Sequence, residues 1–135
     1  MAKSLFFRFL FVFFVMVSCQ NDKDMQIQKI TADQMLEAIE FESIQLIDVR
    51  TPEEFKEGSL KKSQNICITN EDFKAQAEKL DKNKPVYLYC KSGVRSAKAA
   101  EVLKEMGFKI IYEMSGGIQV WKEMGYETMT ETGKS

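Results

Sequence analysis

The residue in this chain best placed to do chemistry is Cys90, because of the segment in which it stands. Residues 84–107, KPVYLYCKSGVRSAKAAEVLKEMG, predict a short buried strand, a tight loop that begins with the cysteine, and an amphipathic helix. Backbone N–H groups and the positive end of the helix dipole converge at such a junction, and both stabilise a thiolate. We expect Ala97, Ala100 and Leu103 to form the buried face of the helix.

The residues that follow Cys90 would complete the site. A loop that wraps round the sulfur aims several N–H groups at one point, which makes a binding site for an anion. Gly93 permits a positive φ, and Lys91 and Arg95 add positive charge. The guanidinium of Arg95 can either bind an incoming oxyanion or pair with an acid. The candidate loop comprises Cys90, Lys91, Ser92, Gly93, Val94, Arg95 and Ser96.

The residue types that are missing narrow the chemistry. The chain has no histidine, which excludes hydrolases that depend on a cysteine–histidine or serine–histidine pair. Its three cysteines form no CxxC pair, which excludes zinc ribbons and thioredoxin-type dithiols, and we expect no metal and no cofactor. The formal net charge of −1 over 135 residues predicts no binding of nucleic acid.

The start of the chain predicts export. Residues 1–18 combine basic side chains with an unbroken apolar run of nine residues, which suits a signal peptide and is too short to span a bilayer. An uncleaved membrane anchor is the alternative. The segment that ends in Ser18 and Cys19 resembles a bacterial lipobox, so we expect lipidation of Cys19 and a polar tether over residues 19–26. The protein would then be an exported bacterial lipoprotein, anchored to a membrane on the periplasmic side or at the cell surface.

Residues 27–126 predict a single domain in which strands alternate with helices. We expect strands at residues 27–30, 45–50, 65–68, 86–89 and 109–114. Helices are expected after the N-caps Thr31 and Thr51, over residues 71–80, after the candidate loop, and after Gly116 and Gly117. This alternation predicts an α/β fold with a parallel sheet, helices on both faces, and Cys90 at the carboxyl edge where ligands bind. We expect residues 127–135 to form a flexible tail.

Together these motifs resemble the rhodanese family of sulfurtransferases over nearly all of residues 27–126. The loop CKSGVRS is the most specific piece, and the segments DVR, EEF and GG, with Trp121, lie at matching intervals. The resemblance implies that Cys90 takes a sulfane sulfur from a donor such as thiosulfate, as a persulfide, and passes it to a thiol or cyanide-like acceptor. Asp48 and Arg50 would support the site structurally, with Arg50 paired to Glu54 or a neighbour, in a monomeric protein.

Two positions depart from the family pattern. Ser59 stands where family members usually have histidine, and Ile118 stands where they often have tryptophan. Both positions are expected to affect packing or loop placement around the cleft and not the nucleophile itself.

Two other functions are compatible with the sequence. A cysteine phosphatase would place five residues between cysteine and arginine, whereas four separate Cys90 from Arg95, and the smaller ring suits one sulfur atom better than a PO₃ group. A non-enzymatic sulfur-carrier or interaction module would keep the fold, although inactive relatives usually lose the cysteine. Cys67 is strand core, a resolving thiol for Cys90, or a disulfide partner.

Overall fold

The computed structural model describes residues 26–41 and 43–133. The predicted signal peptide and the predicted lipidation at Cys19 lie outside the described residues. Among the helices that are described, none is long and apolar enough to cross a membrane.

Five parallel strands form one sheet, as the alternation of elements predicts. The strand order is β1-β5-β4-β2-β3, so β4, which leads to Cys90, lies at the centre between β5 and β2. A central strand of a parallel sheet is covered on both faces, which explains the continuous apolar run of β4. The strands are β1 (Ile27–Ile30), β2 (Gln45–Asp48), β3 (Gln64–Asn65), β4 (Val86–Tyr89) and β5 (Ile111–Met114).

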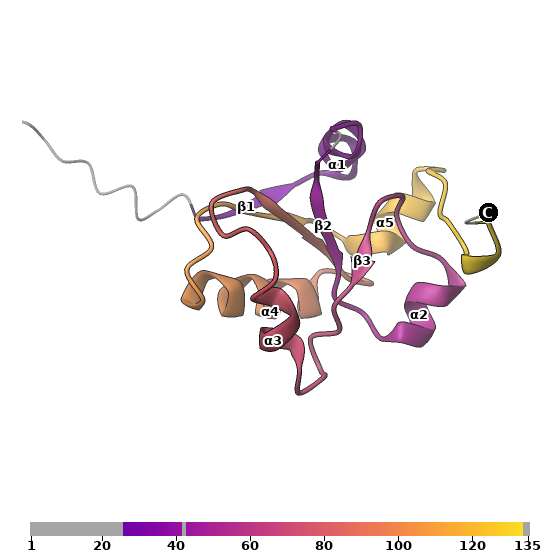
Figure 1. The fold of residues 1–135 in the computed structure, drawn as a ribbon. Coiled ribbons are helices and arrows are strands. Elements are labelled where there is room, and N and C mark those ends of the chain that lie inside the picture. The colour runs from indigo at the N-terminus through magenta and orange to yellow at the C-terminus, as the bar shows by residue number, and fades with distance from the viewer. Residues whose placement is uncertain (1–25, 42, 134–135) are drawn as a thin grey trace, which may run out of the picture.

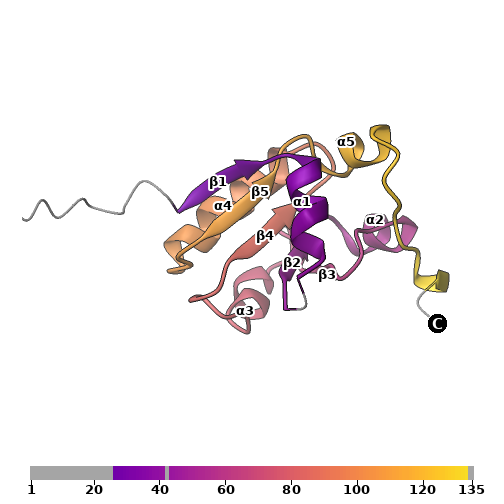
Figure 2. The same cartoon turned by 90° about the horizontal axis from the view of Figure 1, so that it is seen from above.

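The helices cover the sheet from both sides. Figure 1 shows α1 on one side of the sheet and α3 and α4 on the other, while α2 and α5 lie toward the end of the molecule that carries the C-terminus. Figure 2, turned by 90°, shows α1 crossing over the strands and α4 running alongside β5. The helices are α1 (Ala32–Ile39), α2 (Pro52–Glu57), α3 (Phe73–Ala77), α4 (Val94–Glu105) and α5 (Gly117–Glu123), with a 3₁₀ turn at Glu131–Gly133.

Two of the helices begin at capping boxes; the sequence predicts the box at Thr31, and at Thr51 it predicts the N-cap without the reciprocal bond from Glu54. Thr31 accepts the backbone N–H of Gln34, and the Gln34 side chain accepts the N–H of Thr31. Thr51 and Glu54 make the same reciprocal pair at the start of α2, with Pro52 in the first turn. Each box satisfies two backbone donors that the first turn of a helix leaves without partners.

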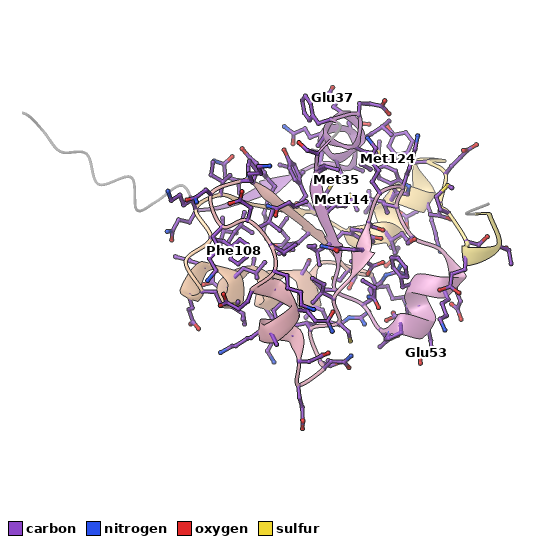
Figure 3. All side chains as sticks on the ribbon, viewed as in Figure 1. Met35, Glu37, Glu53, Phe108, Met114 and Met124 are labelled. Atoms are coloured by element: carbon purple, nitrogen blue, oxygen red, sulfur yellow. The ribbon has the colours of Figure 1, made fainter. Side chains whose placement is uncertain are left out.

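Each face of the sheet carries its own hydrophobic core. Leu88 packs in the core beneath α4 with Leu103 and Phe108. Tyr89, the next residue, belongs to the opposite core, in which Met35 and Met114 pack between α1 and the sheet. Figure 3 shows Phe108 and the two methionines inside the molecule, whereas Glu37 and Glu53 point to solvent. Alternate residues of the strands therefore face opposite layers.

Five of the expected elements differ in the structure. Two differ only in length, since the strands predicted at residues 45–50 and 109–114 are regular at Gln45–Asp48 and Ile111–Met114. Only Gln64–Asn65 forms a regular ladder with β2, so this edge strand is shorter than predicted. Ile66 and Cys67 are buried and Ile68 is half-buried, and the N–H groups of Ile66 and Ile68 donate to the carbonyls of Asp48 and Val49 without continuing the strand. The helix expected over residues 71–80 is regular only at Phe73–Ala77. In α4 the buried face carries Ser96, Ala99, Ala100 and Leu103, whereas Ala97 is exposed. The prediction for Ala97 was therefore wrong, and the buried stripe includes a serine that hydrophobicity cannot indicate.

Residues directly after α5 contact the domain, although the sequence predicted a flexible tail. The indole N–H of Trp121 donates to the carbonyl of Glu127 at 2.9 Å. Ser59 and Met129 exchange two backbone hydrogen bonds, of 2.9 and 2.7 Å, in an isolated antiparallel bridge. Ser59 is 1% exposed, so the position at which the resemblance implies a histidine is here a buried docking point for residues near the C-terminus.

Candidate active site

Cys90 is the first residue after β4, at the carboxyl edge of the sheet, as predicted. Its side chain is buried, with 1% of the residue exposed. The backbone turns at Gly93, whose φ of 107° is strained for any other residue, and α4 begins at the next residue. We call residues 90–96 the Cys90 loop; it consists of a tight turn and the first turn of α4.

Hydrogen-bond donors of the Cys90 loop surround the sulfur. The N–H of Gly93 lies 3.0 Å from Sγ, and the hydroxyl oxygen of Ser96 lies 3.4 Å from it. Burial by itself raises the pKa of the Cys90 thiol. The hydrogen bond with the Ser96 side chain and those with the N–H groups of Ser96, Gly93 and Ser92 outweigh that effect, and the pKa of Cys90 lies below its ordinary value. The site therefore favours a thiolate without any histidine.

The remaining members of the Cys90 loop contribute mainly through the backbone. Lys91 and Ser92 are exposed, and Val94 is 77% exposed. Their exposed side chains leave the backbone N–H groups as the part of the loop that can face the sulfur, as predicted for an anion-binding loop.

The N-terminus of α5 makes backbone hydrogen bonds to the Cys90 loop. The N–H of Ile118 donates to the carbonyl of Cys90 at 2.8 Å, and the N–H of Gln119 donates to the carbonyl of Lys91 at 3.1 Å. A Cβ atom at Gly117 would lie 2.4 to 2.5 Å from those two carbonyl oxygens. The second glycine of the pair is therefore required because two backbones touch there. The hydrogen bond of Ile118 uses backbone atoms alone, while its side chain, 3% exposed, packs in the core beneath α1.

Arg95 pairs with an acid of the protein. Its two terminal nitrogens contact the two oxygens of Glu54 at 2.7 and 2.8 Å, in a bidentate ion pair between α4 and α2. The Arg95 hydrogen bond, helped by those from Thr51 and opposed by partial burial, lowers the pKa of Glu54 to about 2. Of the two roles open to Arg95 from the sequence, the structure shows the ion pair.

Asp48 and Arg50 form a buried support next to the site. Nη2 of Arg50 lies 2.6 Å from Oδ2 of Asp48 and 2.6 Å from the carbonyl of Gly58. The partner of Arg50 is thus the neighbouring Asp48 and not Glu54. Asn65 adds a clamp, since its side-chain amide donates to the carbonyls of Asp48 and Arg50. The pair ties the end of β2 to the end of α2 and does not reach the Cys90 sulfur.

The sequence interpretation missed Glu113, which joins the site through Ser96. Glu113 lies in β5, is 3% exposed, and accepts the Ser96 hydroxyl at 3.0 Å. Strand alternation places Glu113 on the same face as Ile111, which packs in the core beneath α4. A carboxyl group at a core-facing position of an inner strand is the signal that could have indicated it.

An open cavity borders the Cys90 loop. It has a volume of about 250 Å³, and Lys91 and Lys122 line it together with Ile118. Arg50, Glu54, Glu57 and Gln119 complete the lining. Cationic and acidic side chains thus both border this cavity next to the loop.

Cys67 is a free thiol, as is Cys90, so no disulfide joins these two residues. Sγ of Cys67 lies 3.1 Å from the hydroxyl of Thr69. Within the described ranges, no three side chains of the metal-ligating types cluster as a metal site would require.

Known proteins resemble this chain across the region that builds the site. The family model described as a rhodanese-like domain matches residues 31–124. The uncharacterised protein YqhL of Bacillus subtilis is 40% identical over 81 residues, which cover 60% of this chain and 63% of YqhL. The chain therefore spans less than two thirds of that relative.

Two relatives carry names that state an activity. The putative sulfurtransferase YtwF of Bacillus subtilis is 37% identical over 99 residues, which cover 73% of this chain and 93% of YtwF. The thiosulfate sulfurtransferase GlpE of Coxiella burnetii is 33% identical over 86 residues, or 64% of this chain and 78% of GlpE.

Solved structures agree with the fold. A rhodanese-related protein from Thermoplasma volcanium superposes with a TM-score of 0.68 and 35% identity, covering 77% of this chain and 99% of the other. A rhodanese-like domain protein from Staphylococcus aureus gives a TM-score of 0.66 and 29% identity, covering 77% and 98%.

Proposed function

This chain belongs to the family of rhodanese-like domains, and from that premise we propose that it is a sulfurtransferase that carries sulfane sulfur on Cys90. One observation carries the proposal: the buried Sγ of Cys90 accepts the N–H of Gly93 at 3.0 Å, within a loop that lowers the pKa of the thiol. A thiolate is the nucleophilic form of cysteine, and the same donors suit the anionic sulfur of a persulfide.

The proposed reaction has two steps. The Cys90 thiolate attacks the outer sulfur of thiosulfate, an S–S bond forms, and sulfite leaves with the electrons of the broken S–S bond. The enzyme then holds an anionic persulfide. A thiolate or cyanide attacks the outer sulfur, and the electrons of the persulfide bond return to Cys90 as its thiolate.

The geometry around Cys90 supports a donor with a protruding sulfur. The residue is almost fully buried, so a donor has to present a single atom to it. Thiosulfate has such an atom and also carries two negative charges, which Lys91 and Lys122 attract at the border of the cavity.

The geometry of the site does not support the alternative hypothesis of a phosphatase. Arg95, the side chain that would hold phosphate oxygens, already makes a bidentate pair with Glu54. We therefore expect no Cys90-dependent hydrolysis of an aryl phosphate. Hydrolysis at a rate comparable with sulfur transfer would replace the proposal with a phosphatase.

The test is the intact mass of the protein after incubation with thiosulfate, with and without a reductant. We expect the mass of one sulfur atom to be added, removed by the reductant, absent in Cys90→Ser and retained in Cys67→Ser. A persulfide on Cys67, or none with any donor, would overturn the assignment. A Cys90 persulfide that no thiol or cyanide acceptor removes would instead indicate a sulfur-carrier module.

We also propose that the protein is an exported lipoprotein anchored through Cys19. The basic start, the apolar run and the small Ser18 before the cysteine support this proposal. Metabolic labelling with a fatty acid should mark the wild type and not Cys19→Ala. An unlabelled, fully soluble product would contradict it.

A further inference from the structure

A chain of three buried polar side chains runs from the nucleophile into the sheet. The thiol of Cys90 lies 3.4 Å from Oγ of Ser96, and that hydroxyl lies 3.0 Å from Oε1 of Glu113. The three residues come from the end of β4, the first turn of α4 and β5. They are 1%, 0% and 3% exposed, respectively, so the chain is shielded from water.

Glu113 has no cationic partner in the described part of the chain. Its neighbours in register are Leu88 on β4 and Lys29 on β1. Lys29 is exposed, and none of the ion pairs of the described residues joins it to Glu113. A buried carboxylate without a counter-ion is costly, so the negative charge needs another way of being stabilised.

The side chains of Cys90, Ser96 and Glu113 can satisfy one another's hydrogen bonds in two arrangements. In one arrangement the Cys90 thiol donates to Ser96, and the Ser96 hydroxyl donates to an ionised Glu113. If each hydrogen moves one place along, a protonated Glu113 donates to Ser96 and Ser96 donates to a Cys90 thiolate. Both arrangements contain one movable proton and one negative charge, and both leave every member hydrogen-bonded. The carbonyl of Gly93, 3.2 Å from the Ser96 hydroxyl, is a competing acceptor in either case.

We propose that Glu113 is a positioning residue that accepts the Cys90 proton through the Ser96 hydroxyl, so that the thiolate forms without adding a second buried charge. The S–H bond breaks, its electron pair stays on sulfur, and one O–H bond forms at Glu113. No outside base takes part. In a chain without histidine, Glu113 thereby supplies the internal proton acceptor that an imidazole provides elsewhere.

The other charged groups near Cys90, Ser96 and Glu113 either form an ion pair elsewhere or are exposed to solvent. Arg95, on α4, pairs with Glu54 of α2. Lys29 of β1, Lys91 of the Cys90 loop and Lys122 of α5 are exposed to solvent. Two groups that share one proton titrate as a pair, in two steps that belong to neither residue alone.

The test is the pH dependence of Cys90 alkylation by iodoacetamide, read by mass spectrometry of the Cys90 peptide. In the wild type the rate should rise as the pair loses its first proton, remain within about twofold across a plateau, and rise again with the second. Glu113→Gln should show one step, falling about tenfold for each pH unit below its midpoint. Glu101→Gln, a change of an exposed acid on α4, should keep the two steps.

A spectroscopic measurement separates proton transfer from a purely structural role. The infrared difference between reduced and alkylated protein, recorded on the plateau, should contain the C=O stretch of a protonated carboxyl that is lost on alkylation. The band should be absent in Glu113→Gln and in Ser96→Ala, with circular dichroism confirming that both variants are folded. A single step in the wild type, or two steps and a band that persist in Glu113→Gln, would overturn the proposal.

The inference rests on the proposed role of Cys90 as a thiolate nucleophile. Alkylation needs no sulfur donor, so the experiment gives an answer even if thiosulfate proves not to be a substrate.

Discussion

Cys67 and Cys90 are buried to almost the same degree, at 4% and 1% exposure, yet they meet different atoms. In the part of the chain that the structure describes, Sγ of Cys67 has the Thr69 hydroxyl as its hydrogen-bond partner. Sγ of Cys90 instead receives the N–H of Gly93 and lies within reach of Ser96. Burial alone makes cysteine a small hydrophobic residue. The difference between the two thiols comes from the strand-to-helix turn, which directs a backbone N–H donor at Cys90.

Displacing the Cys90 loop should have the largest effect on the difference between the two thiols. Gly117→Ala places a Cβ about 2.5 Å from the Cys90 carbonyl, with a φ of 61° that is itself strained. We expect sulfur transfer to fall by about 100-fold and the free energy of unfolding to fall by about 3 kcal/mol. Enzyme assays and urea unfolding measure the two effects.

The matched control is Gly125→Ala. Gly125 also has a positive φ, of 80°, but nothing lies within 4 Å of a Cβ built there. We expect a loss of about 1 kcal/mol in stability and unchanged sulfur transfer. Equal loss of activity in both variants would show that strain, and not displacement of the Cys90 loop, is responsible.

A smaller effect is expected when the labelling rates of the two thiols are compared directly. We expect iodoacetamide to label Cys90 about tenfold faster than Cys67 near neutral pH, because hydrogen bonds lower the pKa of Cys90 and the thiolate is the reactive form. Because the thiolate of Cys90 persists to lower pH, the labelling rate of Cys90 should begin to fall at a lower pH than that of an ordinary thiol. Peptide mapping after timed labelling distinguishes the residues, and faster labelling of Cys67 would refute the comparison.

The smallest expected effect concerns the ion pair that anchors the first turn of α4 beside Cys90. The pKa of Glu54 is lowered to about 2, so its stabilising effect is complete above its ordinary pKa of 4.5 and is lost as the pH falls toward 2. Because the pair is partly solvated, we expect a loss of about 1 kcal/mol. Urea unfolding at several pH values should show this loss in the wild type and not in Glu54→Gln. Glu53→Gln, which changes the outward-pointing neighbour in Figure 3, should behave as the wild type does.

Local features of the sequence predicted most of what positions Cys90. The capping box at Thr31, the N-cap at Thr51, the β4 run and the glycine turn are set by residues a few positions apart, and the structure confirms them. The parallel sheet follows from the alternation of elements. The partners of Arg95 and Ser96 are different, since Glu54 and Glu113 lie 41 and 17 residues away in sequence. Only the folded topology brings those acids to the loop.

The errors have a related cause. The run from Ile66 to Ile68 has the composition of a strand, but β2 ends at Asp48, so the segment bonds to Asp48 and Val49 and packs on the core as irregular chain. The residues after Tyr126 are polar, but their backbone pairs with Ser59, and a backbone contact leaves no mark in side-chain composition.

The parallel arrangement of the strands also places the start of the domain and the reactive sulfur at opposite edges of the sheet. Ile27 begins β1 at the amino edge of the sheet, whereas Cys90 follows β4 at the carboxyl edge. An attachment before Ile27 therefore holds the molecule by the end opposite to the reactive sulfur. If Cys19 carries a lipid, the opening beside Lys91 and Lys122 would face away from the bilayer, where a partner as large as another folded protein could approach it without steric hindrance.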